Sequence, residues 1–319
     1  MRIVVALLSV AAFAGGATSG AMAQELECGA EVTSNVTLAA PLTGCSTGLV
    51  IGADGITIDL NGYAIEGMGA HTGSGIEALG RSGITIKNGD IRGFDTGVRF
   101  VGVNGSIIKS LTIRNTNRGI SLGNYQIPDA DSSFNEIRGN TITNSSSGIF
   151  MEVSHGNRVL KNSLMNNSSF GVFCFAGQEN HIEKNDALEN GIGIELISCT
   201  ETSLLKNVAS GNRGTGIWRQ ESPGIVQKNS ANDNGGLGIF SFDSHAAFIQ
   251  NVTNGNGLNG LHIEDSQPGH GQFHSITGHV ANANGGYGIF TSIEGVIDGG
   301  KNRAHGNGAP TQCFGFPCE

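Results

Sequence analysis

A glycine followed by an aliphatic residue recurs along the chain at a nearly constant interval. From Gly75-Ile76 to Gly288-Ile289, ten such pairs are separated by 22, 22, 29, 23, 22, 23, 22, 22 and 28 residues. A fixed period of this size is typical of a solenoid, in which each repeat forms one turn and buries its apolar face only against its neighbours. The sequence therefore predicts a stack of short repeats rather than a domain with one globular core.

One repeat shows how such a turn is built. Residues 193–197 read as a short strand with alternating aliphatic side chains, and residues 203–206 read as a second strand. Asn207 marks a corner, after which residues 208–210 form a third short strand. Three short strands per turn predict three parallel sheets wound into a single-stranded right-handed parallel β-helix, an all-β fold of about eleven turns.

Asparagine recurs at two corners of the repeat. The first column contains Asn88, Ser110, Asn140, Asn162, Asn185, Asn207, Asn229, Asn251, His279 and Asn302. The second column contains Asn167, Asn190, Asn212, Asn234, Asn256, Asn284 and Asn307. Stacked Asn amides can hydrogen-bond along the axis, which predicts an Asn ladder. The alternative is that Asn serves only as a turn residue.

The first 23 residues have the pattern of a secretory signal peptide. Arg2 precedes an apolar run at 3–14, and Ala21-Met22-Ala23 is a small-x-small cleavage site. No later stretch approaches the roughly 18 apolar residues of a membrane span. We expect a secreted or periplasmic protein, cut after Ala23 and without a membrane span. Its expected parts are an N-terminal cap at 24–48, the β-helix at 49–307 and a C-terminal tail at 308–319.

Export makes the six cysteines candidates for disulfides. Each end of the chain carries one pair that would pin a cap, and a third pair lies on consecutive turns. For the third pair, metal ligation is the alternative, although no Cys-x-x-Cys and no nearby His pair support it. The three pairs are Cys28 with Cys45, Cys313 with Cys318, and Cys174 with Cys199.

The formal charge is −9, from 18 basic and 27 acidic side chains. This balance argues against a nucleic-acid partner, which would require a basic stripe. Binding of an acidic polysaccharide would require a local basic patch or a bridging cation.

The repeats resemble right-handed parallel β-helix proteins of the pectate-lyase-like superfamily. The resemblance covers residues 49–307, and the segments 48–51 and 56–62 look like the first turns of secreted bacterial β-helix-repeat proteins. It implies the fold but no single reaction, because the superfamily holds lyases, glycoside hydrolases, epimerases, metal-site maturation proteins and adhesins. Gly269-His270-Gly271 matches one polygalacturonase motif, but the other motifs are absent. No catalytic residue is therefore transferred.

Two of the intervals are longer, and both insertions, at 123–134 and 266–273, fall between the first and second strands of a turn. Insertions at one edge form walls beside one face. The outward positions of the first strand, which also include Glu152 and Glu195, carry a row of aromatic side chains. These are Phe150, Phe173, Phe175, Trp218, Phe240 and Phe242. The row could bind a polysaccharide through stacking of sugar rings, or it could only stabilise the sheet.

Titratable residues gather at one end of this row. They are Arg219, Glu221, Asp243, His245, His262, Glu264 and Asp265. Three of the carboxylates recur at intervals of 22 residues, so stacking would raise their pKa values or let them bind a cation such as Ca²⁺. Paired carboxylates are the groups used to hydrolyse a glycosidic bond, and a His and an Arg beside them could serve proton abstraction next to a uronate carboxylate. A solvated column of turn residues is the alternative.

The leading hypothesis is an exported β-helix protein that binds a polysaccharide and could process it as a lyase, epimerase or glycoside hydrolase. One alternative is a non-catalytic surface or adhesion module. Another is a periplasmic accessory protein that handles a metal, which only the nine His residues and the acidic column indicate. No metal ligands can be assigned from the sequence.

Overall fold

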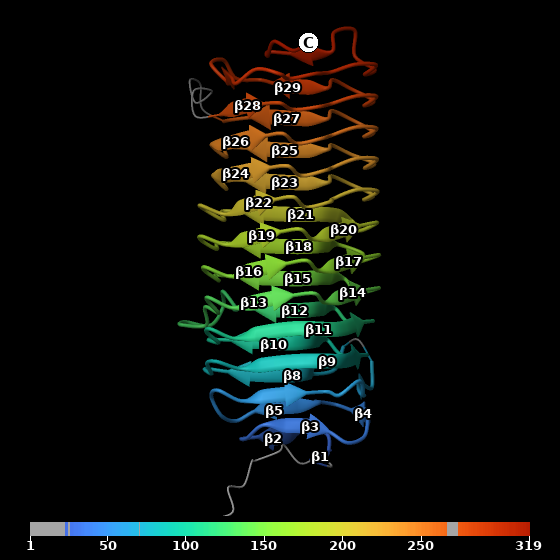
Figure 1. Ribbon diagram of the computed structural model, residues 1–319, viewed down its shortest axis with the longest axis vertical. Helices are drawn as coiled ribbons and strands as arrows, with labels where there is room; N and C mark the ends of the chain where they lie inside the picture. Colours follow the sequence, from blue (N-terminus) through green and yellow to red (C-terminus); the bar gives the residue numbers. More distant parts are fainter. Residues whose placement is uncertain (1–22, 25, 70, 267–273) are drawn as a thin grey trace, which may run out of the picture.

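The chain forms an elongated solenoid of short parallel strands (Figure 1). The computed structural model describes residues 23–24, 26–69, 71–266 and 274–319, so nearly all of the expected signal peptide lies outside it. Over these residues there are 31 strands and no helix, hence no helix that could cross a membrane. The predicted all-β, parallel β-helix fold is confirmed.

One sheet takes one strand from each turn, and all its strand pairs are parallel. Its 13 strands are β2 (Ala30–Val32), β5 (Leu49–Ile51), β8 (Ser74–Leu79), β10 (Thr96–Val101), β12 (Arg118–Leu122), β15 (Ser147–Glu152), β18 (Phe170–Phe175), β21 (Ile192–Ile197), β23 (Ile217–Gln220), β25 (Ile239–Phe242), β27 (Leu261–Glu264), β29 (Ile289–Thr291) and β31 (Cys313–Phe314). The stack is slightly longer than predicted because β2 and β31 lie outside the expected boundaries of the β-helix. β31 follows Gln312 instead of a glycine, and β2 has the small Ala30 after Gly29.

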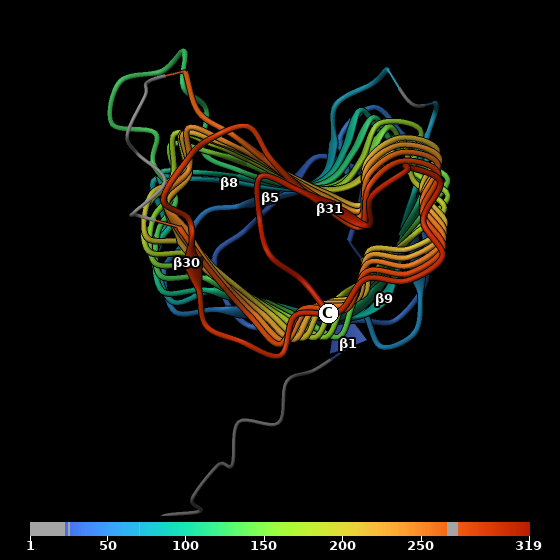
Figure 2. The ribbon, with the colours of Figure 1, turned by 90° about the horizontal axis from the view of Figure 1, so that it is seen from above.

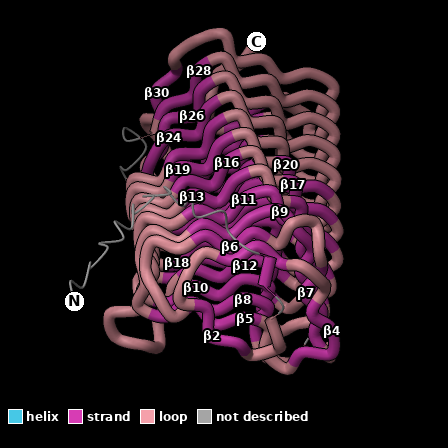
Figure 3. The backbone as a smooth tube through the Cα atoms, turned by 60° about the horizontal axis from the view of Figure 1, so that its bottom comes forward, coloured by secondary structure: helices cyan, strands magenta, loops and turns pink. Residues whose placement is uncertain are grey.

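The other two walls of the solenoid are joined in one sheet of 18 strands (Figure 3). These are β1 (Ala23–Gln24), β3 (Val36–Leu38), β4 (Leu42–Cys45), β6 (Thr57–Asp59), β7 (Ala64–Gly67), β9 (Thr85–Arg92), β11 (Ile107–Arg114), β13 (Glu136–Arg138), β14 (Thr141–Thr143), β16 (Arg158–Leu160), β17 (Ser163–Met165), β19 (His181–Glu183), β20 (Asp186–Leu188), β22 (Ser203–Leu205), β24 (Gly224–Gln227), β26 (Ala246–Ile249), β28 (Ser275–Thr277) and β30 (Ile297–Asp298). The walls merge because β9 and β11 run through the corner between them. Beyond β20, the third wall continues only as single bridges, such as Val208 to Ser230.

The recurring glycine is explained by the close approach of successive turns. A Cβ atom at Gly193 would lie 2.5 Å from the carbonyl oxygen of Gly216 and 2.8 Å from the amide nitrogen of Asn212. The aliphatic residue after each glycine points inward, and Val172, Ile194 and Ile217 are in register and fully buried. The next residue must then point outward, because side chains alternate along a strand.

The Asn ladder is confirmed as a set of buried amide contacts. The side chain of Asn207 accepts hydrogen bonds from the backbone N–H and Nδ2 of Asn185, at 3.0 and 3.1 Å. Its own Nδ2 donates to the carbonyl of Ile182 and to Oδ1 of Asn229, at 2.9 and 3.0 Å. The second predicted column makes the same contacts, for example from Asn212 to Asn234 at 2.9 Å. Turn propensity alone does not account for these contacts.

Three members of the predicted first column depart from this pattern. Asn88 and Ser110 adopt left-handed backbone with φ of 60° and 53°, and they lie one position before the ladder. The ladder position next to Ser110 is Leu111, whose N–H donates to Oδ1 of Asn140 at 3.0 Å. His279 occupies a ladder position, where burial lowers its pKa to about 3 and its Nε2 contacts the hydroxyl of Thr253 at 2.9 Å.

A third, shorter ladder, which sequence analysis missed, lies at the corner after the 13-stranded sheet. The N–H groups of Asn135 and Asn157 donate to Oδ1 of Asn157 and Asn180, at 2.8 and 2.9 Å. The signal was available in the sequence, because these three residues also recur at intervals of 22 and 23.

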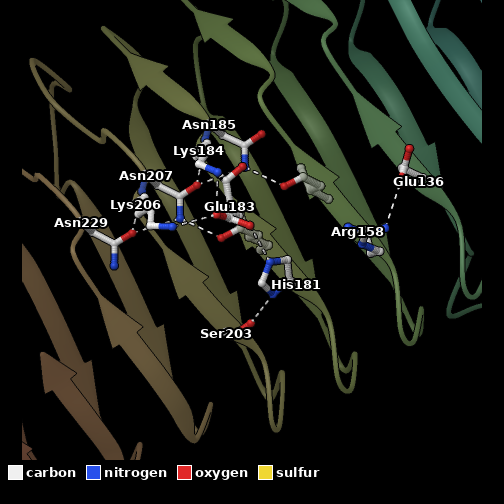
Figure 4. A network of polar contacts seen from close by, with 12 residues as sticks. Glu136, Arg158, His181, Glu183, Lys184, Asn185, Ser203, Lys206, Asn207 and Asn229 are labelled. Carbon is white, nitrogen blue, oxygen red and sulfur yellow. Dashed lines mark hydrogen bonds and ion pairs between the residues drawn. The ribbon is translucent and has the colours of Figure 1, made fainter.

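A charged network covers the outer side of the first ladder (Figure 4). The Glu183 carboxylate contacts Nε2 of His181 at 3.1 Å, Nζ of Lys184 at 3.0 Å and Nζ of Lys206 at 3.3 Å. The hydrogen bonds from His181 and Lys184 are the main cause that lowers the pKa of Glu183 to about 2. Lys184 and Lys206 occupy the left-handed corner, with φ of 56° and 55°, and point to solvent while the following Asn points inward.

All three predicted disulfides are present, and the described residues contain no free cysteine. Cys28–Cys45 and Cys313–Cys318 lie at the two ends of the solenoid, and Cys174–Cys199 joins consecutive turns. The third pair is therefore a disulfide and not a metal ligand. Disulfides persist in oxidising compartments, which indicates a periplasmic or extracellular location.

We expect Asn207→Ala to lower the free energy of unfolding by about 1–3 kcal/mol, because buried donors and acceptors on both neighbouring turns lose their partners. Denaturant unfolding followed by circular dichroism measures the change. Asn117→Ala is the control, since Asn117 is exposed and makes one exposed side-chain hydrogen bond. An equal effect of both substitutions would contradict a stabilising ladder.

We expect no titratable thiol in the denatured, unreduced protein, because all six cysteines are paired. Thiol titration in denaturant measures this, and titration after reduction gives the reference value. Free thiols that map to Cys174 and Cys199 would contradict the bridge between turns and would reopen metal ligation at that pair.

Candidate functional site

The candidate site is the outer face of the 13-stranded sheet. The view along the axis shows this sheet recessed between two lobes of the ribbon (Figure 2). The loop at 123–134, drawn in green, rises on one of these lobes. The ring of Tyr125 in this loop contacts the ring of Phe175 on the sheet, with 5.8 Å between the ring centroids. The first insertion therefore forms a wall beside the face, as predicted.

The same loop encloses a side cavity of about 460 Å³ together with Val153 and His155. Asp129 and Asp131 are among the lining residues of the loop. The second predicted wall, residues 266–273, lies outside the described residues except for Ser266. This includes His270 and its Gly-His-Gly motif.

The predicted aromatic row is present and forms two groups. In the first group, Phe150 and Phe173 stack with 4.7 Å between ring centroids. Phe170, which sequence analysis did not select, lies 4.9 Å from Phe173. The guanidinium carbon of Arg118 lies 3.8 Å from the centroid of the Phe150 ring, within the range of a cation–π contact. This group offers apolar ring surface with one cation at its edge.

The second group begins one turn beyond Glu195. Trp218 meets Phe240 at 4.6 Å, and Phe240 meets Phe242 at 6.4 Å and His262 at 5.4 Å. The row continues to Phe290, whose ring lies 4.4 Å from His262. The sequence could have predicted Phe290 as a member of the row, because it occupies the same outward position of its turn.

Glu195 separates the two groups. In the parallel register it is paired with Phe173 on one turn and Trp218 on the next. Only 8 % of its surface is exposed, and it makes no side-chain hydrogen bond or ion pair with the described residues. Burial among these neighbours raises the pKa of its carboxyl. Sequence analysis placed Glu195 in the row without selecting it, although an acid between aromatic residues was a usable signal.

A second carboxyl on this face, Glu152, has a cationic neighbour. Its carboxylate lies 3.9 Å from a guanidinium nitrogen of Arg118. Burial raises the pKa of Glu152, and the charge of Arg118 acts in the opposite direction. Glu152 thus differs from Glu195, which has no such partner.

The predicted charged end is only partly assembled on this face. His262 lies between Asn259 and Glu264, with Nδ1 3.0 Å from the amide nitrogen and Nε2 2.8 Å from the carboxylate. Asp243 lies one residue past the end of β25, where it accepts hydrogen bonds from the N–H and hydroxyl of Ser266, at 2.6 and 2.8 Å. The carboxylates of Glu264 and Asp243, which the sequence analysis selected, are thus each held by a neighbouring side chain.

Two other predicted members, Glu221 and His245, lie in the loops that follow the strands of this face. Glu221 is exposed and accepts a hydrogen bond from the hydroxyl of Ser198 at 3.1 Å. His245 is also exposed, and its ring centroid lies 5.8 Å from that of His274.

Arg219 and Asp265 do not lie on the outer face, which corrects their expected position. Arg219 is in register with Leu196 and Ser241, both inward, because it follows an outward residue on the strand. It is fully buried and donates to the carbonyl of Ser222, and burial lowers its pKa to about 9. The side chain of Asp265 is also buried, with a carboxylate oxygen 3.1 Å from Nε2 of His274.

The three stacked carboxylates consequently do not form one cation site. Glu221, Asp243 and Asp265 each contact a different partner. Glu221 is exposed to solvent, whereas the side chain of Asp265 is buried. Across the described residues, no group of three or more His, Cys, Asp or Glu side chains is arranged to hold a metal ion.

Fold and surface together define a disulfide-linked parallel β-helix protein with an aromatic outer face. The chain belongs to the family described as periplasmic copper-binding protein (NosD), whose pattern matches residues 50–223. Residues 178–308 also match the pattern described as right handed beta helix region. The chain matches no curated protein sequence.

Solved structures with similar folds include an alginate epimerase and an alpha-1,3-glucanase. The periplasmic alginate epimerase AlgG is 13% identical with a TM-score of 0.59, over 88% of this chain and 75% of that chain. The catalytic domain of a GH87 alpha-1,3-glucanase in complex with tetrasaccharides is 13% identical with a TM-score of 0.58, over 90% of this chain and 63% of that chain. At this identity the likeness shows the fold alone.

The family description raises the question of copper, and the donor set does not fit it. Copper sites use thiolate, thioether or imidazole ligands. All six cysteines are in disulfides, and Met151 is buried in the core while Met68 lies exposed on another turn. Among the described residues, no group of three or more His, Cys, Asp or Glu side chains is arranged to hold a metal ion. No step of a mechanism is therefore assigned to copper.

We expect Glu195→Gln to raise the thermal unfolding midpoint at neutral pH. Burial places the folded-state pKa of Glu195 above its value of 4.5 in the unfolded chain. Between these pKa values the folded state binds more protons, so stability falls as pH rises through this range and stays lower above it. The gain should disappear well below pH 4.5, where both states are protonated.

Thermal melts of both proteins across this pH range measure the effect. Glu189→Gln is the matched control, because Glu189 is exposed at the corner that precedes the strand of Glu195. A lower midpoint for Glu195→Gln at neutral pH would show that the carboxylate has a stabilising partner in solution.

Proposed function

We propose that this protein is exported, binds a polysaccharide along the outer face of its 13-stranded sheet, and processes it there. The observation that carries the proposal is the aromatic row beside the wall formed by residues 123–134. From Phe150 to His262 the register advances five turns, which is about 24 Å at the usual strand spacing. This length accommodates on the order of five sugar rings, whose C–H faces pack well on aromatic rings.

The structural neighbours support polysaccharide as the ligand class by analogy of fold. One is named as an alginate epimerase, and another was solved in complex with tetrasaccharides. A shared fold does not transfer a reaction, so lyase, epimerase and hydrolase chemistry must be separated by the residues of this chain. The periplasmic description of the family and the disulfides support export.

A surface or adhesion module is the second candidate function, since an aromatic row can bind a partner without turning it over. The metal-handling alternative rests on the family description, and the described residues do not support it. Incubation with a panel of polysaccharides separates the first two. New reducing ends or unsaturated products indicate an enzyme, whereas retention without product indicates a binding module.

We expect Trp218→Ala to weaken polysaccharide binding by about 1–2 kcal/mol, because one aromatic contact with a sugar ring is lost. This corresponds to a roughly 5- to 30-fold higher Kd. Affinity electrophoresis in gels that contain each polysaccharide measures the change. Ile225→Ala is the control, since Ile225 is an exposed apolar residue on the other sheet. Unchanged binding of the Trp218 variant would contradict binding on this face.

A further inference from the structure

We propose that Glu195 is the general acid of this face, and that it protonates the glycosidic oxygen of a neutral polysaccharide, so that processing is hydrolysis. This inference rests on the proposed function, because it requires a polysaccharide on the aromatic row. It adds the reaction, the substrate class and the residue that carries the proton.

The first argument is position. Glu195 is the only member of the outward row between Phe173 and Trp218, and hence lies at the junction of the two aromatic groups. A chain that stacks on both groups must pass over Glu195. The bond between two bound sugars would then lie above its carboxyl group.

The second argument is the missing partner. Glu77 is paired with Arg99, Glu152 lies beside Arg118, and Glu264 contacts His262. Glu195 alone among these carboxyl groups has neither an ion pair nor a hydrogen bond with the described residues, although 92 % of its surface is buried, the complement of its 8 % exposure. Its carboxyl oxygens have no hydrogen-bond partner among the described residues, yet they keep contact with solvent. Buried polar groups normally have partners, and a bound ligand could supply one here.

The third argument concerns the substrate. The cations Arg99 and Arg118 on this face each lie next to a carboxylate. A polyuronate would bring another negative charge to each sugar beside the unpaired Glu195, and like charges in a site repel. Proton abstraction next to a uronate carboxylate would also need a cation to neutralise it. A neutral polysaccharide avoids both costs.

The protonation state supports this role. Burial raises the pKa of Glu195, so that its carboxyl holds a proton to higher pH than an exposed glutamate. A general acid works best when its pKa approaches the working pH. The apolar neighbours that stack on sugar would thus also keep the proton on the acid.

The reaction balances with water as the only co-reactant. Glu195 gives its proton to the glycosidic oxygen, and the bond between this oxygen and the anomeric carbon breaks with its electron pair on the oxygen. Water adds to the anomeric carbon, and the proton that it loses returns Glu195 to its acid form. The products are two shorter chains, one of them with a new reducing end.

The test compares wild-type protein, Glu195→Gln and the exposed control Glu189→Gln. The neutral probes are laminarin, α-1,3-glucan and xylan, and the acidic probes are sodium alginate and polygalacturonate. Reducing ends measure hydrolysis, absorbance of unsaturated products measures elimination, and affinity electrophoresis measures binding. Glu195→Gln should lower kcat on the cleaved neutral probe by about 100-fold or more, the order of general-acid catalysis, with Kd nearly unchanged.

An activated substrate separates proton donation from a structural role. A 2,4-dinitrophenyl glycoside of the shortest product has a leaving group that needs no proton. Glu195→Gln should cleave it at nearly the wild-type rate, and wild type should not show on it the fall in rate that it shows on the polysaccharide as pH rises through the pKa of Glu195. An equal loss of rate on both substrates would overturn the assignment, and so would no loss of rate on either substrate.

Other outcomes also decide the matter. If wild type releases unsaturated products, or acts only on the acidic probes, hydrolysis of a neutral chain is wrong. If wild type binds a neutral probe but releases no reducing ends, Glu195 is not an acid catalyst, while binding on the aromatic row stands. If wild type binds none of the probes, the proposed function fails first, and this inference fails with it.

Discussion

The structure depends on buried amide groups that hold each turn in register with the next. The side chain of Asn207 alone has four hydrogen bonds with atoms of neighbouring turns, and the same pattern recurs along two corners of the solenoid. Because each amide must face the one below it, a turn cannot slip by one residue without breaking the stack. Register in turn decides which side chains reach the surface, so the aromatic face depends on the ladders at the corners.

The period of the sequence predicted most of the fold, because a repeat shows the same physical constraint many times. The glycine of each turn is needed because the backbones of successive turns approach too closely for a side chain. The Asn after each corner is needed because its buried amide bonds to the Asn of the next turn. The errors came where repeats are irregular. Asn88 and Ser110 occupy the left-handed position that Lys184 and Lys206 occupy in later turns, so the ladder position itself falls on Gly89 and Leu111. β31 follows Gln312 instead of a glycine, and β2 has only the small Ala30 after its glycine.

The site was harder to predict, because composition does not show which side chains have partners. Alternation along the strand placed the aromatic row correctly, yet the same rule turns Arg219 inward, where sequence analysis had grouped it with surface carboxylates. Asp265 is likewise buried against His274. Glu195 stood in the outward column of the sequence, but its isolation became visible only when the pairs formed by Glu152 and Glu264 were known.

The fixed register also spaces the side chains of the aromatic face at equal steps along the axis. Each turn interacts with its two neighbours through backbone and amide contacts that are the same along much of the stack. Duplication or loss of a whole turn would therefore lengthen or shorten the face by one step of about 4.8 Å without redesign of the core. Relatives could thus be matched to longer or shorter segments of a polymer through turn number alone, while Glu195 and its aromatic neighbours keep their local geometry.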